Sequence, residues 1–433
     1  MCSTCRSGWI PDARGRAGAR FALVRRAVSV GLRPRVRAVM LAIALACGAL
    51  PAGAQDGDLS RCLAIIRRSP QARRVTAETW KRHTSQLTTD ARIVGEQRAQ
   101  PEFRLPIWDY LAVMVDDERI ADGQRLMREH RTTFDSVARR FGVDPHVIAA
   151  IWGIESNFGR GMGSYEVLRS LATLSCHGRR QSYFRRELLA ALRIVQRGDV
   201  DGTRFLGSWA GAFGQVQFMP GTFEWLAVDF DGDGRRDILH STGDVLASAA
   251  NYLRNARWRD GAPWGLEVRL PASLPTRGEG RRVKRPLSTW MARGVKRMDG
   301  AALVSGGLSP AMPAGLHLPA GPVGPAFLTF ANFDAIYRYN ASEAYTLAIA
   351  HLADRLRGGG PFVTPWPTDD LGLSRAERRE LQRLLVARGH DIGAPSGVLT
   401  TRTRAAVKAE QERLGHEATG RPGQRLLEAL RER

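Results

Sequence analysis

The chain has 433 residues, of which 43% are hydrophobic, and it includes 10 Trp and 15 Phe. This composition excludes a disordered polymer and supplies enough apolar surface for more than one packed domain. The formal net charge is +21, to which residues 1–54 contribute nine Arg and one Asp. The excess favours an anionic partner such as cell-wall polymer, membrane surface or nucleic acid, although a solvated arginine-rich surface explains it as well.

The amino terminus is typical of an export signal. Arg33, Arg35 and Arg37 precede an apolar run over residues 38–50, and small residues up to Ala54 offer a cleavage site. The pattern predicts that residues 1–54 are removed after export. No later segment is apolar enough to be predicted as a membrane span.

The cysteines leave two questions open. Three of the five lie in the predicted signal: Cys2, Cys5 and Cys47. Cys47 also fits a lipoprotein cleavage site, but Ala44 stands where a larger aliphatic residue is usual, so membrane attachment through Cys47 is the second alternative. Cys62 and Cys176 would remain in an oxidising compartment, either as a disulfide or as two buried free thiols.

The hydrophobic pattern predicts a mainly α fold of the α+β class. Residues 56–205 have apolar side chains at three- and four-residue spacing, which indicates helices. Between residues 263 and 325, Pro, Gly and short apolar runs indicate a small sheet or long ordered loops. The glycine- and proline-rich stretch at 358–370 is predicted to be a linker, and a helical unit over 371–433 follows it.

Glu155 is the strongest candidate for a chemical role. A helix is predicted from Asp144, which precedes a proline, to the stop at Gly159. Within it, Glu155 falls on the same face as Ile148 and Trp152. Burial raises the pKa of a carboxyl, which is how a general acid usable near neutral pH arises. A glutamate at a frayed helix end, bonded to solvent or to an arginine, is the alternative.

Four downstream segments combine aromatic side chains with Gln, Asn, Ser and Tyr donors, a mixture that suits sugar rings. They are residues 179–184, 208–220, 249–252 and 336–345. Their order, together with residues 100–103, Trp108 and Tyr110, resembles the membrane-bound lytic murein transglycosylase B family. The resemblance implies a lysozyme-like catalytic core over residues 55–357 with a small β insertion. With the export signal, it also implies a location in the periplasm or cell envelope.

The resemblance further implies that glycan strands of peptidoglycan are the partner and that Glu155 is the catalytic acid. Positions matching the family's substrate cleft are Arg179, Arg180, Tyr183, Ser208, Gln217, Tyr252, Tyr339, Asn340 and Tyr345. Two departures, Trp209 for a tyrosine and Gln215-Val216 for Tyr-Gly, are predicted to alter subsites without touching the acid. By resemblance, the enzyme cleaves the β-1,4 bond between N-acetylmuramic acid and N-acetylglucosamine and closes a 1,6-anhydro ring, with no catalytic cofactor.

Other functions stay open in the sequence. A second carboxylate near Glu155 would favour a lysozyme-type hydrolase, and the candidates for it are Glu166, Glu187 and Glu224. A wall-binding protein that has lost catalysis is the next alternative. Nucleic-acid binding is not expected, because the export signal removes the chain from cytoplasmic DNA and no recognition motif is present.

An acidic loop after residue 228 has spacing similar to that of an EF-hand calcium loop, with Gly234 at its sharp turn. His240 stands where that loop needs a glutamate, but the resembling family closes a longer loop with a later acid. The predicted ligands of a structural Ca²⁺ are Asp229, Asp231, Asp233, the Arg235 carbonyl and Asp244. Asp237 is a substitute for the last of these, and a solvated Asp-Gly turn is the alternative to a metal site.

Residues 371–433 resemble the three-helix peptidoglycan-binding domain found on wall-lytic enzymes. Glu410 departs from its pattern, since it stands where an aromatic residue is usual, and Ser396 replaces a common acid. A helical bundle that only packs against the enzyme or spaces it is the alternative to a binding role.

Overall fold

The computed structural model describes residues 52–99 and 105–432. The residues from Ala52 onward form one compact unit, and the description concerns that unit. The predicted cleavable signal lies almost wholly outside the described residues, as do Cys47 and the segment 100–103. Among the residues described, no helix is both long and apolar enough to cross a bilayer.

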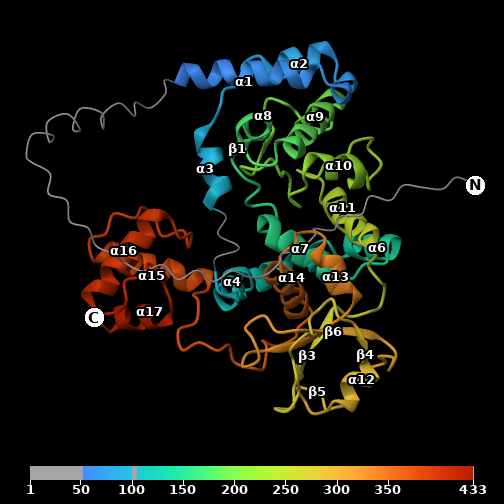
Figure 1. Cartoon of the computed structure of the whole chain (residues 1–433), viewed down its shortest axis with the longest axis vertical. Helices are drawn as coiled ribbons and strands as arrows, with labels where there is room; N and C mark the ends of the chain where they lie inside the picture. The colour runs from blue at the N-terminus through green and yellow to red at the C-terminus, as the bar shows by residue number, and fades with distance from the viewer. Residues whose placement is uncertain (1–51, 100–104, 433) are drawn as a thin grey trace, which may run out of the picture. The chain divides into compact units, whose positions relative to one another are not determined.

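Helices dominate the described chain (Figure 1). In chain order they are α1 Ala52–Arg67, the 3-10 helix η1 Pro70–Arg74, α2 Ala77–Thr84, α3 Ala91–Ala99, α4 Ile107–Met114, α5 Asp117–Glu129, α6 Arg131–Phe141, α7 Pro145–Ser156, α8 Val167–His177, α9 Gln181–Arg197, α10 Pro220–Leu226, α11 Thr242–Asn255, α12 Leu287–Ala292, α13 Ala331–Tyr337, α14 Glu343–Leu356, α15 Arg375–Ala387, α16 Thr401–Arg413 and α17 Gln424–Arg431. The strands are β1 Tyr165–Glu166, β2 Leu206–Gly207, β3 Gly265–Arg269, β4 Arg285–Pro286, β5 Lys296–Arg297, β6 Pro313–His317 and β7 Ala326–Thr329.

Helix α7 lies in the centre of the main core and contacts α5, α6, α11 and α14 (Figure 1). Ile148 and Ile151 are fully buried in it. Burial of each such side chain contributes roughly 1.5–3 kcal/mol relative to exposure. Because neighbouring helices contact α7 on several sides, most of its residues are buried, and this explains why its sequence is an apolar run. The carboxyl of Glu155 therefore belongs to a helix whose other residues are largely buried.

A disulfide joins Cys62 of α1 to Cys176 of α8. Of the two alternatives that the sequence leaves open, the structure thus contains the paired form. The bond connects residues 114 positions apart, so it ties the first helix to the hairpin of α8 and α9.

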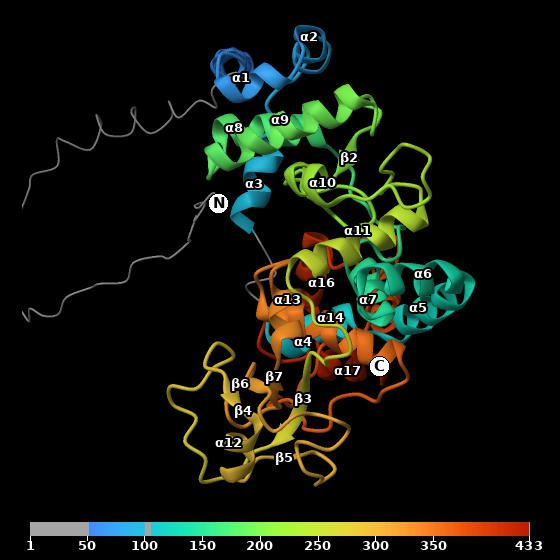
Figure 2. The ribbon, with the colours of Figure 1, turned by 90° about the vertical axis from the view of Figure 1, so that its right-hand side faces the viewer.

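The region between residues 263 and 325 contributes to a five-stranded antiparallel sheet in the order β4-β6-β7-β3-β5 (Figure 2). It has its own core, in which Trp290 and Leu303 are fully buried. Of the two expectations for this region, the small sheet is the one that forms. Helix α13 follows the last strand and leads directly into α14, which packs on α7. The prediction of a mainly helical fold with a small β part is confirmed.

The C-terminal module, residues 371–433, contains three helices with a separate small core that includes Leu381, Val407 and Leu427. The Ser374 side chain and Glu377 form a capping box at the start of α15. The preceding segment, predicted to be a linker, is packed rather than free, since the Phe362 ring stacks on His351 with centroids 3.9 Å apart. The module is thus attached to the rest of the described chain through a packed segment.

Candidate active site

The acid-bearing helix begins as predicted and ends earlier. The Asp144 carboxylate accepts a hydrogen bond from the His146 amide at 2.9 Å, which caps the start of α7. The helix ends at Ser156 because Asn157 and Phe158 both adopt left-handed conformations, with φ of 50° and 58°. The residue that stops the helix is therefore Asn157, two residues before the predicted stop at Gly159, and Glu155 lies in the last turn.

Close packing fixes this helix end. The Phe158 ring turns back onto α7 and meets Trp152 edge-on, with ring centroids 5.4 Å apart. A Cβ atom on Gly153 would lie 2.7 Å from Cζ of Phe158, so only glycine allows this approach. The turn that carries Glu155 is consequently rigid, as a site for proton transfer requires.

The Glu155 carboxyl has a strongly perturbed acidity. Burial raises its pKa from 4.5 to about 7, while a hydrogen bond donated by the Tyr345 hydroxyl opposes the rise. The side chain keeps partial exposure on the cavity side, and protein surrounds it elsewhere. A pKa near 7 leaves both protonation states populated at neutral pH, which suits a group that first gives and then takes a proton.

The three carboxylates that would indicate a hydrolase form ion pairs or hydrogen bonds with residues other than Glu155. Glu224 forms ion pairs with Arg193 and Arg197. Glu187 accepts a hydrogen bond from the Gly221 amide at 2.7 Å. Glu166 lies 3.1 Å from Arg169. Within the described chain, the influences on the pKa of Glu155 are burial and Tyr345, with no second carboxylate among them.

Three predicted cleft tyrosines gather beside the acid. Tyr345 contacts Glu155 directly, and burial together with the negative charge of Glu155 holds the pKa values of Tyr345 and Tyr339 well above 10. The Tyr339 hydroxyl donates to the Val216 carbonyl at 2.7 Å, and its ring lies 4.5 Å from that of Tyr252. Both tyrosines near the acid thus stay protonated and neutral across the pH range in which Glu155 titrates.

The other predicted cleft residues lie on segments flanking this cluster. Arg180 covers the Tyr183 ring at 4.6 Å, and burial is the main cause that raises the pKa of Tyr183 to about 12. Gln217 has a left-handed backbone, with φ of 47°, and its amide donates to the Gly214 carbonyl at 2.8 Å.

Two further cleft predictions are held by local contacts. The Ser208 hydroxyl accepts from the Ala212 amide at 3.0 Å, and the Arg179 backbone exchanges hydrogen bonds with the Gln97 side chain. Their part in binding a glycan remains a prediction.

One sequence departure acts on the acid-bearing helix itself. The Trp152 indole donates to Oε1 of Gln215 at 2.7 Å, and the Ser156 hydroxyl donates to the Gln215 carbonyl at the same distance. Gln215 thereby links α7 to the loop over residues 208–218 on both sides of Glu155. The Gln215 side chain thus supports the helix that carries the acid and forms no hydrogen bond with Glu155 among the described residues, and its effect on subsites remains a prediction.

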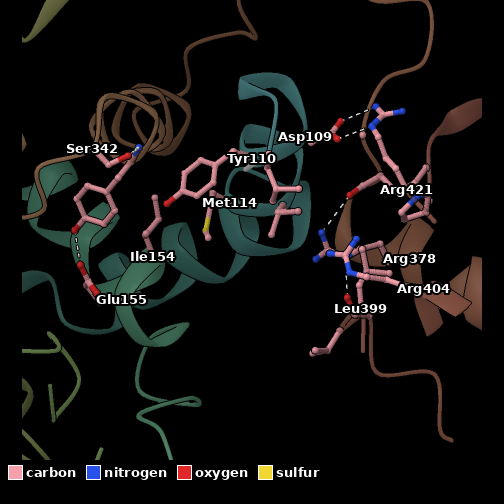
Figure 3. Close-up of a pocket in the computed structure, with 18 of the residues that line it drawn as sticks. Asp109, Tyr110, Met114, Ile154, Glu155, Ser342, Arg378, Leu399, Arg404 and Arg421 are labelled. Atoms are coloured by element: carbon pink, nitrogen blue, oxygen red, sulfur yellow. Dashed lines mark hydrogen bonds and ion pairs between the residues drawn. The ribbon is translucent and has the colours of Figure 1, made fainter. Parts of the chain in front are cut away.

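A cavity of about 460 Å³ opens beside Glu155, and we call it the Glu155 cavity (Figure 3). Its catalytic-core lining includes Tyr110, Met114, Ile154, Glu155, Asn340 and Tyr345. Its opposite wall belongs to the C-terminal module and includes Leu373, Arg378, Val398, Leu399, Arg404 and Arg421. Asn340 and Tyr345 are the predicted cleft residues that line it. The module wall was not predicted from the sequence, because no local pattern indicates how two domains pack against each other.

The acidic loop brings three carboxylates together. Oxygen atoms of Asp229, Asp231 and Asp244 lie within 4.8 Å of one another, and Asp244 is fully buried. Burial, followed by the nearby charges of Asp231 and Asp229, raises the pKa of Asp244 despite two backbone amides that donate to it. Such a set of hard oxygen ligands fits Ca²⁺. Asp233 does not belong to this cluster, and its carboxylate accepts from the Arg235 amide instead.

The fold and the site together define a class. A mainly helical core that presents a glutamate with a raised pKa beside a cavity fits the class of enzymes that cleave glycosidic bonds with a carboxyl as general acid. Residues 58–354 match the family model described as the transglycosylase SLT domain, and residues 374–430 match that of a peptidoglycan binding domain. The chain therefore belongs to the transglycosylase SLT domain family, with a C-terminal peptidoglycan binding domain, and the family predicted from the sequence is confirmed.

Named relatives agree with this assignment. The chain is 30% identical over 251 residues to membrane-bound lytic murein transglycosylase B of Escherichia coli (strain K12), and the match covers 56% of the chain and 65% of that relative's length. Crystalline SltB3 of Pseudomonas aeruginosa, in complex with NAG-anhNAM-pentapeptide, is 46% identical with a TM-score of 0.69, over 86% of this chain and 99% of that one. Escherichia coli Slt35 in complex with calcium is 26% identical with a TM-score of 0.60, over 70% of this chain and 94% of that one.

Proposed function

We propose that this protein is a lytic transglycosylase that cleaves the β-1,4 bond between N-acetylmuramic acid and N-acetylglucosamine of peptidoglycan. The observation that carries the proposal is Glu155, a carboxyl with a pKa near 7 that has Tyr345, and no second carboxylate among the described residues, as its partner. Family membership and the peptidoglycan fragment bound by SltB3 support the same substrate class.

The reaction uses one carboxyl twice, first as an acid and then as a base. Protonated Glu155 donates its proton to the glycosidic oxygen, so the N-acetylglucosamine 4-hydroxyl leaves, and the acetamide of the muramoyl residue assists the developing cation at C1. The Glu155 carboxylate then accepts the proton of the muramoyl 6-hydroxyl, whose oxygen bonds to C1 and closes the 1,6-anhydro ring. Glu155 ends protonated, ready for the next turnover, and water is not a reactant.

A lysozyme-type hydrolase is the rival function. Most such enzymes place a second carboxylate on the far side of the sugar, about 5–10 Å from the acid, as a nucleophile or as a base for water. Glu187 and Glu224 are bonded to Gly221 and to arginines respectively, and this favours the internal 6-hydroxyl as the nucleophile. A wall-binding protein without catalysis is disfavoured because its glutamate would have no need of a raised pKa.

The remaining assignments follow from this function. The predicted export signal places the enzyme in the periplasm or cell envelope, and Cys47 offers a lipid anchor as the second alternative. The C-terminal module is proposed to hold the enzyme on peptidoglycan, in agreement with its family match. The test of the function is the identity of the sugar end that the enzyme releases from purified sacculi.

A structural calcium ion is part of the proposal. Asp229, Asp231 and Asp244 would hold it, with the Arg235 carbonyl as a further ligand. The ion would neutralise the crowded carboxylates and stiffen the loop between α10 and α11. It takes no part in the reaction.

Calcium is expected to raise the melting temperature measured by calorimetry in calcium chloride against EGTA. At a free concentration 100 times Kd the ion stabilises the folded state by about 2.7 kcal/mol. Asp231→Asn should abolish the increment, because it removes one of the three clustered carboxylates. Asp201→Asn is the matched control, since Asp201 also caps an exposed turn but lies outside the loop. Equal melting temperatures with and without calcium would identify the loop as an ordinary turn.

A further inference from the structure

We propose that the module wall of the Glu155 cavity binds the peptide stem of the substrate, and that Arg404 and Arg378 receive a stem carboxylate. The inference rests on the proposed function and adds the part of the substrate that the catalytic core leaves unassigned. It makes these two arginines specificity-determining residues, with no role in proton transfer.

The first support is the position of the arginines. Figure 3 shows Glu155 and Ile154 on one side of the cavity and Arg378, Arg404 and Arg421 across from them. A muramoyl residue placed for attack at Glu155 carries its stem on the lactyl group, outside the sugar ring. The stem must therefore leave the reacting centre toward neighbouring surfaces, and the module wall is one that lines the same cavity.

The second support is the charge balance of this wall. Arg421 is neutralised, because its guanidinium donates to Asp109 at 2.6 and 2.7 Å and to Asp370 at 2.5 Å. Arg378, which is nearly fully buried, donates to two backbone carbonyls, those of Gly397 at 2.7 Å and Leu373 at 3.2 Å. These carbonyls orient its guanidinium, whose charge is offset only in part by the nearby carboxylates of Asp116 and Glu377.

Arg404 adds a further positive charge to the module wall. No hydrogen bond or ion pair to its guanidinium occurs among residues 52–99 and 105–432, although the side chain lines the cavity. Two guanidinium groups thus face the cavity without a carboxylate bonded to them. A planar guanidinium favours carboxylate as a ligand, through paired charge-assisted hydrogen bonds.

The apolar part of the same wall narrows the ligand class. Leu373, Val398 and Leu399 lie beside the two arginines, and Val398 is 64% exposed. Such surface suits small aliphatic side chains such as the methyl groups of alanine. A short, alanine-containing peptide with free carboxylates satisfies both halves of the wall, which is the chemistry of a peptidoglycan stem.

The test compares kcat/KM on glycan strands that carry stems with kcat/KM on strands from which an amidase has removed them. The ratio is kcat/KM on stem-bearing strands divided by kcat/KM on stem-free strands. Arg404→Gln is expected to lower this ratio about tenfold, the effect of losing one charge-assisted hydrogen bond. Arg404→Lys, which keeps the charge, should restore part of the ratio. Arg402→Gln is the matched control, since Arg402 lies on the same helix with its side chain 66% exposed.

Binding measurements separate this inference from the proposed function. A stem-bearing muropeptide is titrated calorimetrically into Glu155→Gln and into the double variant that adds Arg404→Gln, each checked for an unchanged melting temperature. Weaker binding by the double variant supports the stem site even if the protein turns over neither strand. An unchanged kcat/KM ratio, an equal loss on both strands, or equal affinities of the two variants would overturn it.

Discussion

Replacing Glu155 with glutamine is expected to reduce turnover of purified sacculi by at least about 10²–10⁴-fold, the range that one general acid or base contributes. The effect should lie at the upper end, because the same carboxyl serves as acid in bond cleavage and as base in ring closure. Glutamine keeps the shape and can accept the Tyr345 hydrogen bond, so affinity for a glycan fragment should change little. Release of soluble muropeptides and calorimetric titration measure the two quantities.

Glu166→Gln is the control for this experiment. Glu166 is exposed and pairs with Arg169, so its loss should leave sacculus turnover near that of the unmodified enzyme. A Glu155→Gln enzyme that retained substantial activity would remove Glu155 from the chemistry.

The second large effect concerns pH. Since bond cleavage needs protonated Glu155, we expect kcat/KM, which reports ionisations of the free enzyme, to fall as the pH rises through the pKa of about 7. The Tyr345 hydroxyl donates to Glu155 and thereby favours the carboxylate. Its removal in Tyr345→Phe should raise the pKa further and move the alkaline limb of the profile upward by about one pH unit or more, given 1.5–3 kcal/mol for a hydrogen bond to a charged group. Initial rates on soluble glycan at fixed ionic strength measure the shift.

Tyr339→Phe separates this effect from a general disturbance of the tyrosine cluster. The Tyr339 hydroxyl donates to the Val216 carbonyl and not to Glu155, so the variant should keep the midpoint of the limb even if its rate falls. A Tyr345→Phe profile whose midpoint stayed in place, or moved to lower pH, would contradict the assigned hydrogen bond.

The local sequence pattern was sufficient to predict those features that depend on residues close together in the chain. The capping Asp144, the apolar face of α7 and the raised pKa of Glu155 all follow from spacing within twelve residues. The exact helix end did not follow, because the left-handed turn at Asn157 and Phe158 depends on packing against Gly153. For the tyrosines, resemblance and not pattern placed Tyr252, Tyr339 and Tyr345 in one cleft.

The contacts between the C-terminal module and the rest of the chain could not be predicted from the sequence. The ion pair between Asp109 and Arg421 joins residues 312 positions apart, and neither residue stands in a motif. The module wall of the Glu155 cavity was therefore absent from the predicted site. In the acidic loop, spacing suggested Asp233 as a ligand, yet the backbone turns its carboxylate to the Arg235 amide while Asp244 of the next helix joins the cluster.

The most direct test of the central claim is the fate of oxygen when purified sacculi are digested in oxygen-18-labelled water. If the muramoyl 6-hydroxyl attacks C1 and Glu155 takes its proton, the products will end in a 1,6-anhydro ring. Mass spectrometry will then find muropeptides that are lighter by one water than the corresponding hydrolysis products and that contain no oxygen-18. Muropeptides with a reducing end that carries oxygen-18 would show that water attacks instead, and would contradict the account.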